Sequence, residues 1–177
     1  MRFPEDGVVL SASDLEHRLE NVLAVHGPSL GRVPASYTRD AGERDDLFQE
    51  IVISIWRALP SFRGECSERT FVFRIAHNRG ISHTARRRAS AVMRADDEEA
   101  VMDQAPTPEQ SLASSQEAQR LLAAVQGLSI AYRQVVTLSL EGLSYAEIAD
   151  VLGISESNVG ARLTRARQSL RRQLERG

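Results

Sequence analysis

Apolar side chains recur at every third or fourth position along most of this chain, and that spacing restricts its fold more than any other feature. The stretch ERDDLFQEIVISIWRAL at 43–59 shows the pattern best, because one helical face there collects Leu47, Phe48, Ile51, Ile55 and Leu59. Alternation typical of strands is weak throughout. The sequence therefore predicts an all-α protein.

Two blocks of helical pattern are expected, separated by a stretch without any sustained period. The expected helices lie at 13–25, near 29–38, at 43–59, at 69–89, at 116–128 and at about 131–141. Gly27 and Pro28 are expected to end the first of them. In the helix at 69–89, the residues expected to face inward are Phe71, Val72, Ile75 and Asn78.

The intervening stretch ADDEEAVMDQAPTPEQS is acidic and contains two prolines, which is typical of a flexible linker. It is either an inert tether or a functional segment. The sequence predicts two small helical domains joined by a flexible acidic linker: an extension at 1–14, a first domain at 15–90, the linker at 91–114 and a second domain at 115–177.

Charge is strongly segregated, although the formal net charge is only −2. Residues 57–94 hold nine arginines against two acids, whereas residues 95–114 hold six acids and no arginine. The segment 156–177 is basic again. All 22 basic residues are arginine, whose planar guanidinium suits phosphates and guanine edges. This pattern indicates two anionic contacts with a repelling connector between them.

The C-terminal stretch SYAEIADVLGISESNVGARLTRARQSLRRQL at 144–174 has the features of a helix-turn-helix. Ser144 and Glu147 form a capping-box pattern, so a helix is expected to begin there. Ala149, Gly153 and Val159 have the spacing of the helix contact, the turn and the anchor of such a motif.

The second helix of this motif is expected to be a DNA recognition helix. Its inner face collects Val159, Leu163, Ala166 and Leu170. Its outer face and shoulders offer side chains for base edges and phosphates, namely Ala161, Arg162, Thr164, Arg165, Arg167 and Gln168.

The first domain carries two features that a duplex-binding helix-turn-helix does not require. Gln49, Ile53 and Trp56 share a helix face away from the apolar stripe, which indicates either a protein partner or burial against another helix. Aromatic residues then alternate with arginines, a composition that suits single-stranded or melting DNA. Phe62 and Phe73 are expected to stack bases, while Phe71 is expected in the core.

Enzymatic and membrane functions receive little support. The four histidines have no metal-ligand spacing, and the chain contains no glycine-rich phosphate loop or nucleophile constellation, so neither catalysis nor a cofactor is expected. No apolar run reaches the length of a membrane span and no signal peptide is visible, so a cytoplasmic protein without membrane insertion is expected. Cys66 is either an incidental small residue or a redox site.

Three stretches together resemble the sigma-70 family, specifically its small extracytoplasmic-function (ECF) RNA polymerase sigma factors. They are DDLFQEIVISIWRALPSFRG, RTFVFRIAHN and LSYAEIADVLGISESNVGARLTRARQSL. The resemblance implies a transcription-initiation factor that binds core RNA polymerase at its clamp helices and flap, directs it to promoters of stress-response genes and promotes melting. It also implies an anti-sigma factor as a partner.

The resemblance assigns the first domain to sigma region 2 and the second to region 4. Polymerase contacts are implied for Asp46, Gln49, Glu50 and Trp56, to which the exposed face adds Ile53. The expected minus-ten contacts, to duplex and melted strand, are Phe62, Arg63, Phe73, Arg74, Asn78, Arg79, Arg86 and Arg87. The expected minus-thirty-five contacts are Ala161, Arg162, Thr164, Arg165 and Arg167.

The chain departs from the family in the recognition helix, where SNVGAR stands in place of GTVKSR or GTVRSR. Gly160 and Ala161 thus replace a basic residue and a serine, which leaves open how the minus-thirty-five element is read there. A free-standing helix-turn-helix regulator remains the alternative. It accounts for residues 115–174 but gives no role to Trp56, to the aromatic and arginine segment or to the linker.

Overall fold

The computed structural model describes residues 12–95 and 113–175, and within these ranges it contains helices and no strand. The all-α prediction is therefore confirmed. The α-helices are α1 (Ala12–Leu30), α2 (Ala41–Ala58), α3 (Glu68–Ala95), α4 (Ala113–Gln126), α5 (Ile130–Leu140), α6 (Tyr145–Leu152) and α7 (Glu156–Leu174). Two short 3₁₀ turns, η1 (Pro34–Ser36) and η2 (Leu59–Ser61), precede and follow α2.

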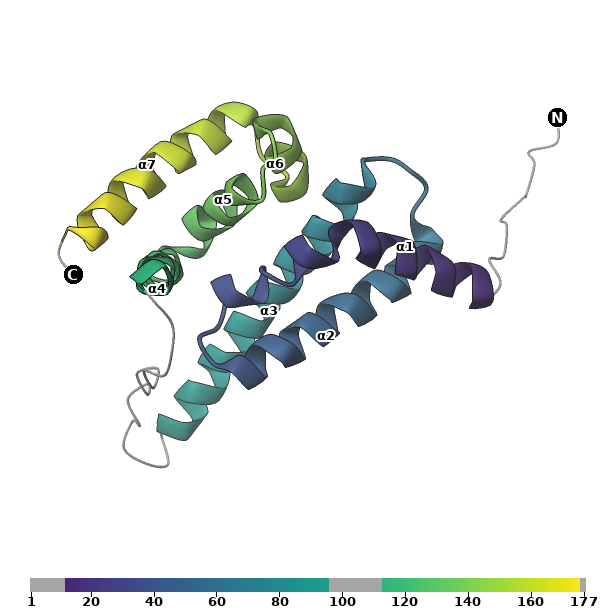
Figure 1. The fold of residues 1–177 in the computed structure, drawn as a ribbon, viewed down its shortest axis with the longest axis horizontal. Coiled ribbons are helices and arrows are strands. Elements are labelled where there is room, and N and C mark those ends of the chain that lie inside the picture. Colours follow the sequence, from purple (N-terminus) through teal and green to yellow (C-terminus); the bar gives the residue numbers. More distant parts are fainter. Residues whose placement is uncertain (1–11, 96–112, 176–177) are drawn as a thin grey trace.

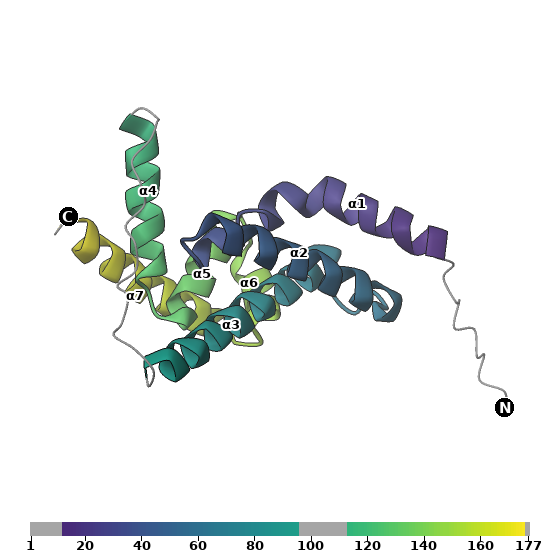
Figure 2. The ribbon, with the colours of Figure 1, turned by 90° about the horizontal axis from the view of Figure 1, so that it is seen from below.

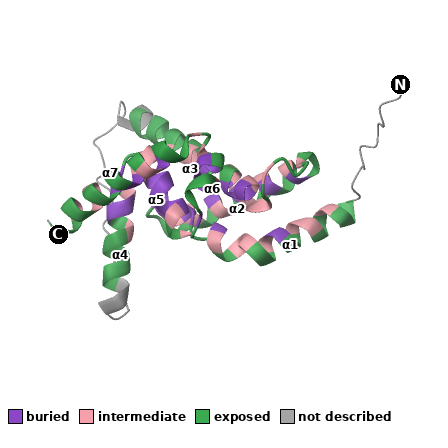
Figure 3. Ribbon diagram, turned by 90° about the horizontal axis from the view of Figure 1, so that it is seen from above, coloured by how far each residue is buried: buried purple, intermediate pink, exposed green. Residues whose placement is uncertain are grey.

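The helices form two groups that lie against each other (Figures 1 and 2). Helices α1, α2 and α3 make the first group, and α4 to α7 make the second. The predicted stripe builds the first core: Leu47, Ile51 and Ile55 of α2 and Leu59 of η2 are completely buried, while Phe48 is half-buried. Buried residues are concentrated on α5 and on the inward sides of α2, α3 and α6, and the outer faces of α1 and α4 are exposed (Figure 3).

Several expected boundaries differ from the structure. Helix α1 does not end at Gly27 but continues through Pro28 to Leu30. Pro28 lies in the last turn, so it removes one backbone donor near the end, and complete burial of Leu30 favours the longer helix. The helix expected near 29–38 is only the 3₁₀ turn η1, and Asn78, expected to face inward, is exposed. Most of the expected linker lies outside the described residues.

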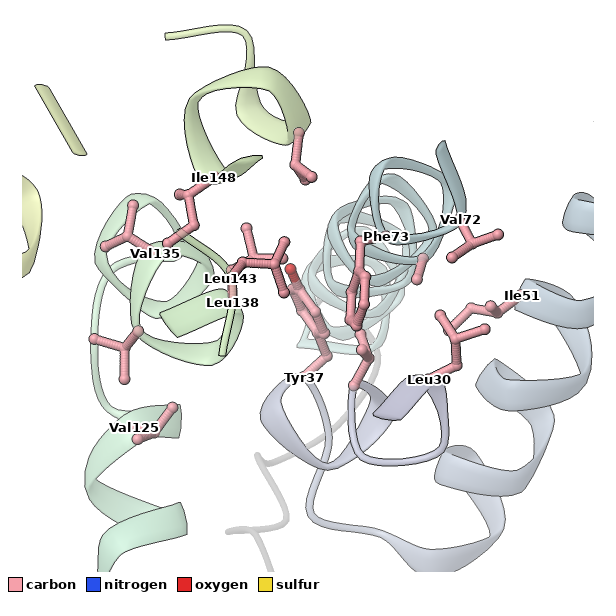
Figure 4. Packing of buried hydrophobic residues seen from close by; sticks show 14 of the residues in the cluster. Leu30, Tyr37, Ile51, Val72, Phe73, Val125, Val135, Leu138, Leu143 and Ile148 are labelled. Atoms are coloured by element: carbon pink, nitrogen blue, oxygen red, sulfur yellow. The ribbon is translucent and has the colours of Figure 1, made fainter. Parts of the chain in front are cut away.

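A shared apolar layer joins the two groups. Tyr37 and Phe73 from the first group face Leu138 and Leu143 from the second (Figure 4), and all four belong to one buried cluster. Gly80 in α3 allows this packing, because a Cβ atom at that position would overlap the ring of Tyr37. The two groups consequently share part of one core.

Polar contacts reinforce the boundary between the groups. Arg32 donates from Nε and Nη2 to the two carboxylate oxygens of Glu141, at 2.8 and 2.5 Å. Gln126 of α4 donates to the carbonyl oxygens of Ala35 and Thr38. Burial raises the pKa of Glu141, but hydrogen bonds from Arg32 and Ser29 outweigh it, and the net pKa is lowered.

A histidine is enclosed at this boundary. The Tyr37 hydroxyl lies 2.7 Å from Nδ1 of His77, and the Arg133 guanidinium lies over the Tyr37 ring, 5.9 Å from its centroid. His77 is 1% exposed, and its Nε2 has no hydrogen-bond partner among the residues that the structure describes. Burial lowers the pKa of His77 to about 4, so the imidazole is neutral in the folded protein at neutral pH.

Acidification from pH 7 to 5.5 is expected to lower the free energy of unfolding through His77 by about 1 kcal/mol. The pKa of His77 is about 4 when folded and 6.5 when unfolded, so below pH 6.5 the unfolded chain binds the extra proton. Stability contributed by the neutral imidazole is complete above pH 6.5 and declines as the pH falls towards 4. Urea titrations at both pH values measure this loss.

The variant His77→Asn is the control for this expectation, because the asparagine side-chain oxygen replaces Nδ1 as the acceptor for Tyr37 and does not titrate. Its stability should change less between pH 7 and 5.5 than that of the natural protein. An equal change in the two proteins would show that other groups cause the pH dependence.

Candidate polymerase and promoter interfaces

Helices α6 and α7 form the predicted helix-turn-helix. The Ser144 side chain accepts from the backbone N–H of Glu147, and the Glu147 carboxylate accepts from the backbone N–H of Ser144 at 2.7 Å. Gly153 has φ +65°, a left-handed conformation that a side chain would strain. Ala149 and Val159 are buried on either side of the turn. The predicted capping box, turn and anchor are thus confirmed.

Helix α7 presents one face to the core and the opposite face to solvent. Val159, Leu163 and Ala166 are buried, whereas Ala161, Thr164 and Arg165 are exposed, as the sequence predicted. A shallow hollow on the exposed side is lined by Thr164, Arg167, Gln168, Arg171 and Arg172. Arg162 is half-buried and donates from Nε to the Asn158 side chain at 3.0 Å. This basic, exposed face suits a DNA major groove.

Helix α2 carries the predicted second face. Ile53 is 46% exposed and Trp56 is 43% exposed, and Gln49 beside them is also exposed. The sequence left open whether another helix covers this face; within the described residues none does. A large aromatic and a β-branched residue side by side on a surface are typical of a protein-binding site.

The connection from α2 to α3 brings two aromatic rings together. Phe62 stacks on Phe71, with ring centroids 4.4 Å apart and an interplanar angle of 28°. Both rings are half-buried, and Arg63 next to them is exposed. An aromatic pair at the edge of a basic segment is a surface on which an unpaired base can stack.

Two family models match this chain, Sigma-70 region 2 at residues 23–90 and Sigma-70 region 4 at residues 118–170. The sigma factor CnrH of Cupriavidus metallidurans is 30% identical over 94% of both chains. The ECF sigma-E factor of Escherichia coli K12 is 31% identical over 73% of both chains. The chain belongs to the sigma-70 family, as an ECF RNA polymerase sigma factor.

Solved structures share the fold of this ECF sigma factor. CnrH in complex with the cytosolic domain of CnrY has a TM-score of 0.67 and 24% identity, covering 90% of this chain and 89% of the other. RpoE from Bartonella quintana, solved with the anti-sigma factor NepR, has a TM-score of 0.69 and 23% identity, covering 93% and 98%. The expected arrangement of two helical regions agrees with both.

Phe73 of this sigma factor does not lie where the sequence suggested. Its ring is completely buried between the two helix groups (Figure 4), so it offers no face to a base in this structure. Phe71, which the sequence placed in the core, is half-buried, packs against the buried cluster and stacks on Phe62. The expected role of Phe73 in stacking is therefore wrong for this structure.

The other expected minus-ten residues are on the surface of α3 and the preceding loop. Asn78 and Arg79 are exposed. Arg86 donates to both carboxylate oxygens of Glu50 at 2.6 and 2.9 Å, which joins a residue expected to contact DNA to one expected to contact polymerase. Arg87 lies 3.3 Å from the carboxylate of Glu43.

Arg74 bridges to the helix-turn-helix domain, because its Nη2 donates to the carbonyl oxygen of Asp150 in α6 at 2.7 Å. Arg69, which the sequence did not single out, donates to the carbonyl of Glu141 and lies 3.7 Å from the Glu147 carboxylate. Nothing in the local sequence around Arg69 identifies this role, because its partners lie more than 70 residues further along the chain.

Other kinds of site find no support in the residues that the structure covers. No group of three or more His, Cys, Asp or Glu side chains within 12–95 and 113–175 could hold a metal ion. In the same ranges, no helix has the length and apolar content needed to span a bilayer. Cys66 is a free, half-buried cysteine in the loop before α3.

Proposed function

We propose that this sigma factor binds polymerase and promoter through three separate surfaces. The exposed face of α2 binds the clamp helices of core RNA polymerase, the Phe62 loop with α3 captures the melted minus-ten strand, and α7 reads the minus-thirty-five duplex. The presence of an uncovered Trp56 and Ile53 on the same chain as a helix-turn-helix is the observation that supports this proposal most. A lone duplex-binding regulator has no use for that apolar face.

The polymerase surface consists of one helix face with apolar and polar parts. Ile53 and Trp56 supply the apolar centre, and Gln49 and the exposed Asp46 supply polar contacts. Glu50 belongs to the same surface, although here its carboxylate accepts from Arg86. An exposed apolar centre with a polar rim is how protein-binding surfaces are usually built.

The minus-ten surface combines one stacking ring with a row of cations. Phe62 is the stacking residue, while Arg63, Arg79, Arg86 and Arg87 follow the backbone and Asn78 offers hydrogen bonds to a base. Arg74 contributes once its bond to Asp150 is broken. Trapping an extruded base offsets a cost of a few kcal/mol for unstacking.

The minus-thirty-five surface is the exposed face of α7. Thr164 and Arg165 lie at its centre for base edges, and Arg162 and Arg167 lie towards the phosphates. Ala161 lies on the same face without a polar group, so it can contact only apolar base edges such as the thymine methyl. The recognition rule at positions 160 and 161 therefore differs from that of relatives with a basic residue and a serine.

Replacing Arg165 with alanine is expected to weaken binding to the minus-thirty-five element by ~1–3 kcal/mol if the guanidinium contacts a base. The loss is measured by titrating the full chain, at fixed salt, with duplexes that carry the minus-thirty-five element or a single-base variant of it. The specificity at one base pair should relax. The matched control is Arg120→Ala on the exposed side of α4, which should leave binding unchanged. Equal weakening on every sequence would make Arg165 a phosphate contact instead.

The regions are proposed as 15–90 for polymerase and minus-ten binding and 115–177 for minus-thirty-five binding, with 91–114 as the connector. The protein is proposed to act in the cytoplasm. It is not proposed as an enzyme, because polymerase supplies the chemistry of transcription. Since a solved relative is bound to the anti-sigma factor NepR, we also propose an anti-sigma partner for this chain.

Mixing the full chain with bacterial core polymerase and promoter DNA tests the whole proposal. A fluorescent base in the minus-ten strand should report unpairing only when both proteins are present. Tight duplex binding by the chain alone, with no polymerase association, would support the free-standing regulator instead.

A further inference from the structure

The side chain of Arg18 in α1 lies against the loop that we propose captures the minus-ten base. Its guanidinium carbon is 5.5 Å from the centroid of the Phe62 ring, and its Nη1 lies 3.4 Å from the carbonyl oxygen of Leu59 in η2. Helix α1 packs beside this connection between α2 and α3 (Figure 1). Arg18 lies outside the sequence pattern that indicated DNA binding.

The arrangement gives the Phe62 ring two different neighbours. Phe71 stacks on the ring with centroids 4.4 Å apart, and the Arg18 guanidinium lies over the ring as a cation–π partner. Phe71 is fixed within α3, whereas Arg18 is a long side chain whose one hydrogen bond to the described residues is the weak one to Leu59. A base that stacks on Phe62 is therefore expected to take the place of Arg18, because Phe71 packs against the buried core.

We propose that Arg18 is a positioning residue for minus-ten capture. In the free protein it covers the ring of Phe62, and when an unpaired base stacks there the guanidinium moves aside to contact a phosphate of the same strand. This inference rests on the proposed role of Phe62. It adds α1, a helix with no other arginine, to the DNA-binding surface of the chain.

The chemistry of arginine suits both states. A guanidinium stacks on an aromatic face through its plane and binds a phosphate through its N–H groups. Lysine retains only the charge, and leucine retains only the apolar cover. The three side chains therefore separate the stacking, electrostatic and purely structural contributions.

The test uses holoenzyme assembled from the full chain and a bacterial core polymerase. The probe is a fork-junction DNA whose unpaired strand carries the minus-ten sequence that natural holoenzyme selects from a randomised pool. Arg18→Ala is expected to weaken binding by up to about 5-fold at 0.1 M salt, because it loses one phosphate contact on the single strand, whereas the cation–π contact is made only in the free protein. The slope of log affinity against log salt should become shallower by about 0.7, as expected for one phosphate contact on a single strand.

Rescue variants decide between DNA contact and simple support of the loop. Arg18→Lys should restore the salt slope, whereas Arg18→Leu should not. An unchanged salt slope in Arg18→Ala, with only a lower melting temperature, would overturn the inference and leave Arg18 as a packing residue.

Failure of the proposed function gives a different result. If natural holoenzyme selects no minus-ten sequence, or if Phe62→Ala binds the fork junction as well as the natural protein, then the loop is not the capture site. If Phe62→Ala loses binding while Arg18→Ala keeps both affinity and slope, only the inference about Arg18 is wrong.

Discussion

Replacing Phe73 with alanine is expected to lower the free energy of unfolding by ~3–5 kcal/mol, which is a large fraction of the stability of a small protein. The ring is fully buried, and truncation loses its apolar contacts and leaves a cavity. The lost contacts lie where α3 meets the second helix group, beside Tyr37, Leu138 and Leu143 (Figure 4). Urea denaturation followed by circular dichroism measures the change.

Phe62→Ala is the matched control, since it removes the same side chain from a half-buried position on the loop. It should cost less stability than Phe73→Ala but impair capture of the melted strand. If Phe73→Ala were as stable as the natural protein and lost only promoter melting, Phe73 would be a DNA residue and the buried position would not represent the working state.

Local sequence patterns predicted the elements whose determinants lie close together in the chain. The stripe from Leu47 to Leu59 identified α2 and its buried face, because one helix packs that face on one core. The capping box at Ser144 and the left-handed glycine at Gly153 identified the helix-turn-helix, because their hydrogen bonds and backbone geometry are local.

Helix α3 shows why the candidate site was only partly predictable. It packs against α1 and α2 on one side and against α6 on the other, so residues on different faces are buried by different partners. Periodicity within α3 cannot say which of Phe71 and Phe73 meets the second helix group. The sequence consequently assigned Phe73 to the DNA surface although its ring is buried, but it correctly placed an aromatic cluster in this segment.

Contacts between segments far apart in the chain could not be predicted from local sequence patterns. Arg32 and Glu141 are 109 positions apart, and Arg74 and Asp150 are 76 apart. A single sequence contains no signal that pairs such residues. The three-dimensional arrangement is also what brings Arg18 of α1 to Phe62 of the loop.

Replacing Trp56 with alanine is expected to weaken binding to core polymerase by at least ~2 kcal/mol, or about 30-fold in Kd. The indole is 43% exposed in the free protein, so its truncation removes little from the core. Large aromatic residues at the centre of an interface supply a disproportionate part of the binding free energy. Titration of labelled full-length chain with core polymerase measures the loss.

Val25→Ala provides a matched control for Trp56→Ala, because Val25 is 69% exposed and belongs to α1, not to the α2 face. It removes an exposed apolar side chain from the same region and should leave polymerase affinity unchanged. Duplex affinity for the minus-thirty-five element should also be unchanged in Trp56→Ala, since α7 does not depend on α2 for its exposed face. Equal polymerase affinity for Trp56→Ala and the natural chain would place the polymerase contact elsewhere on the molecule and leave the exposed Ile53 and Trp56 pair without a partner.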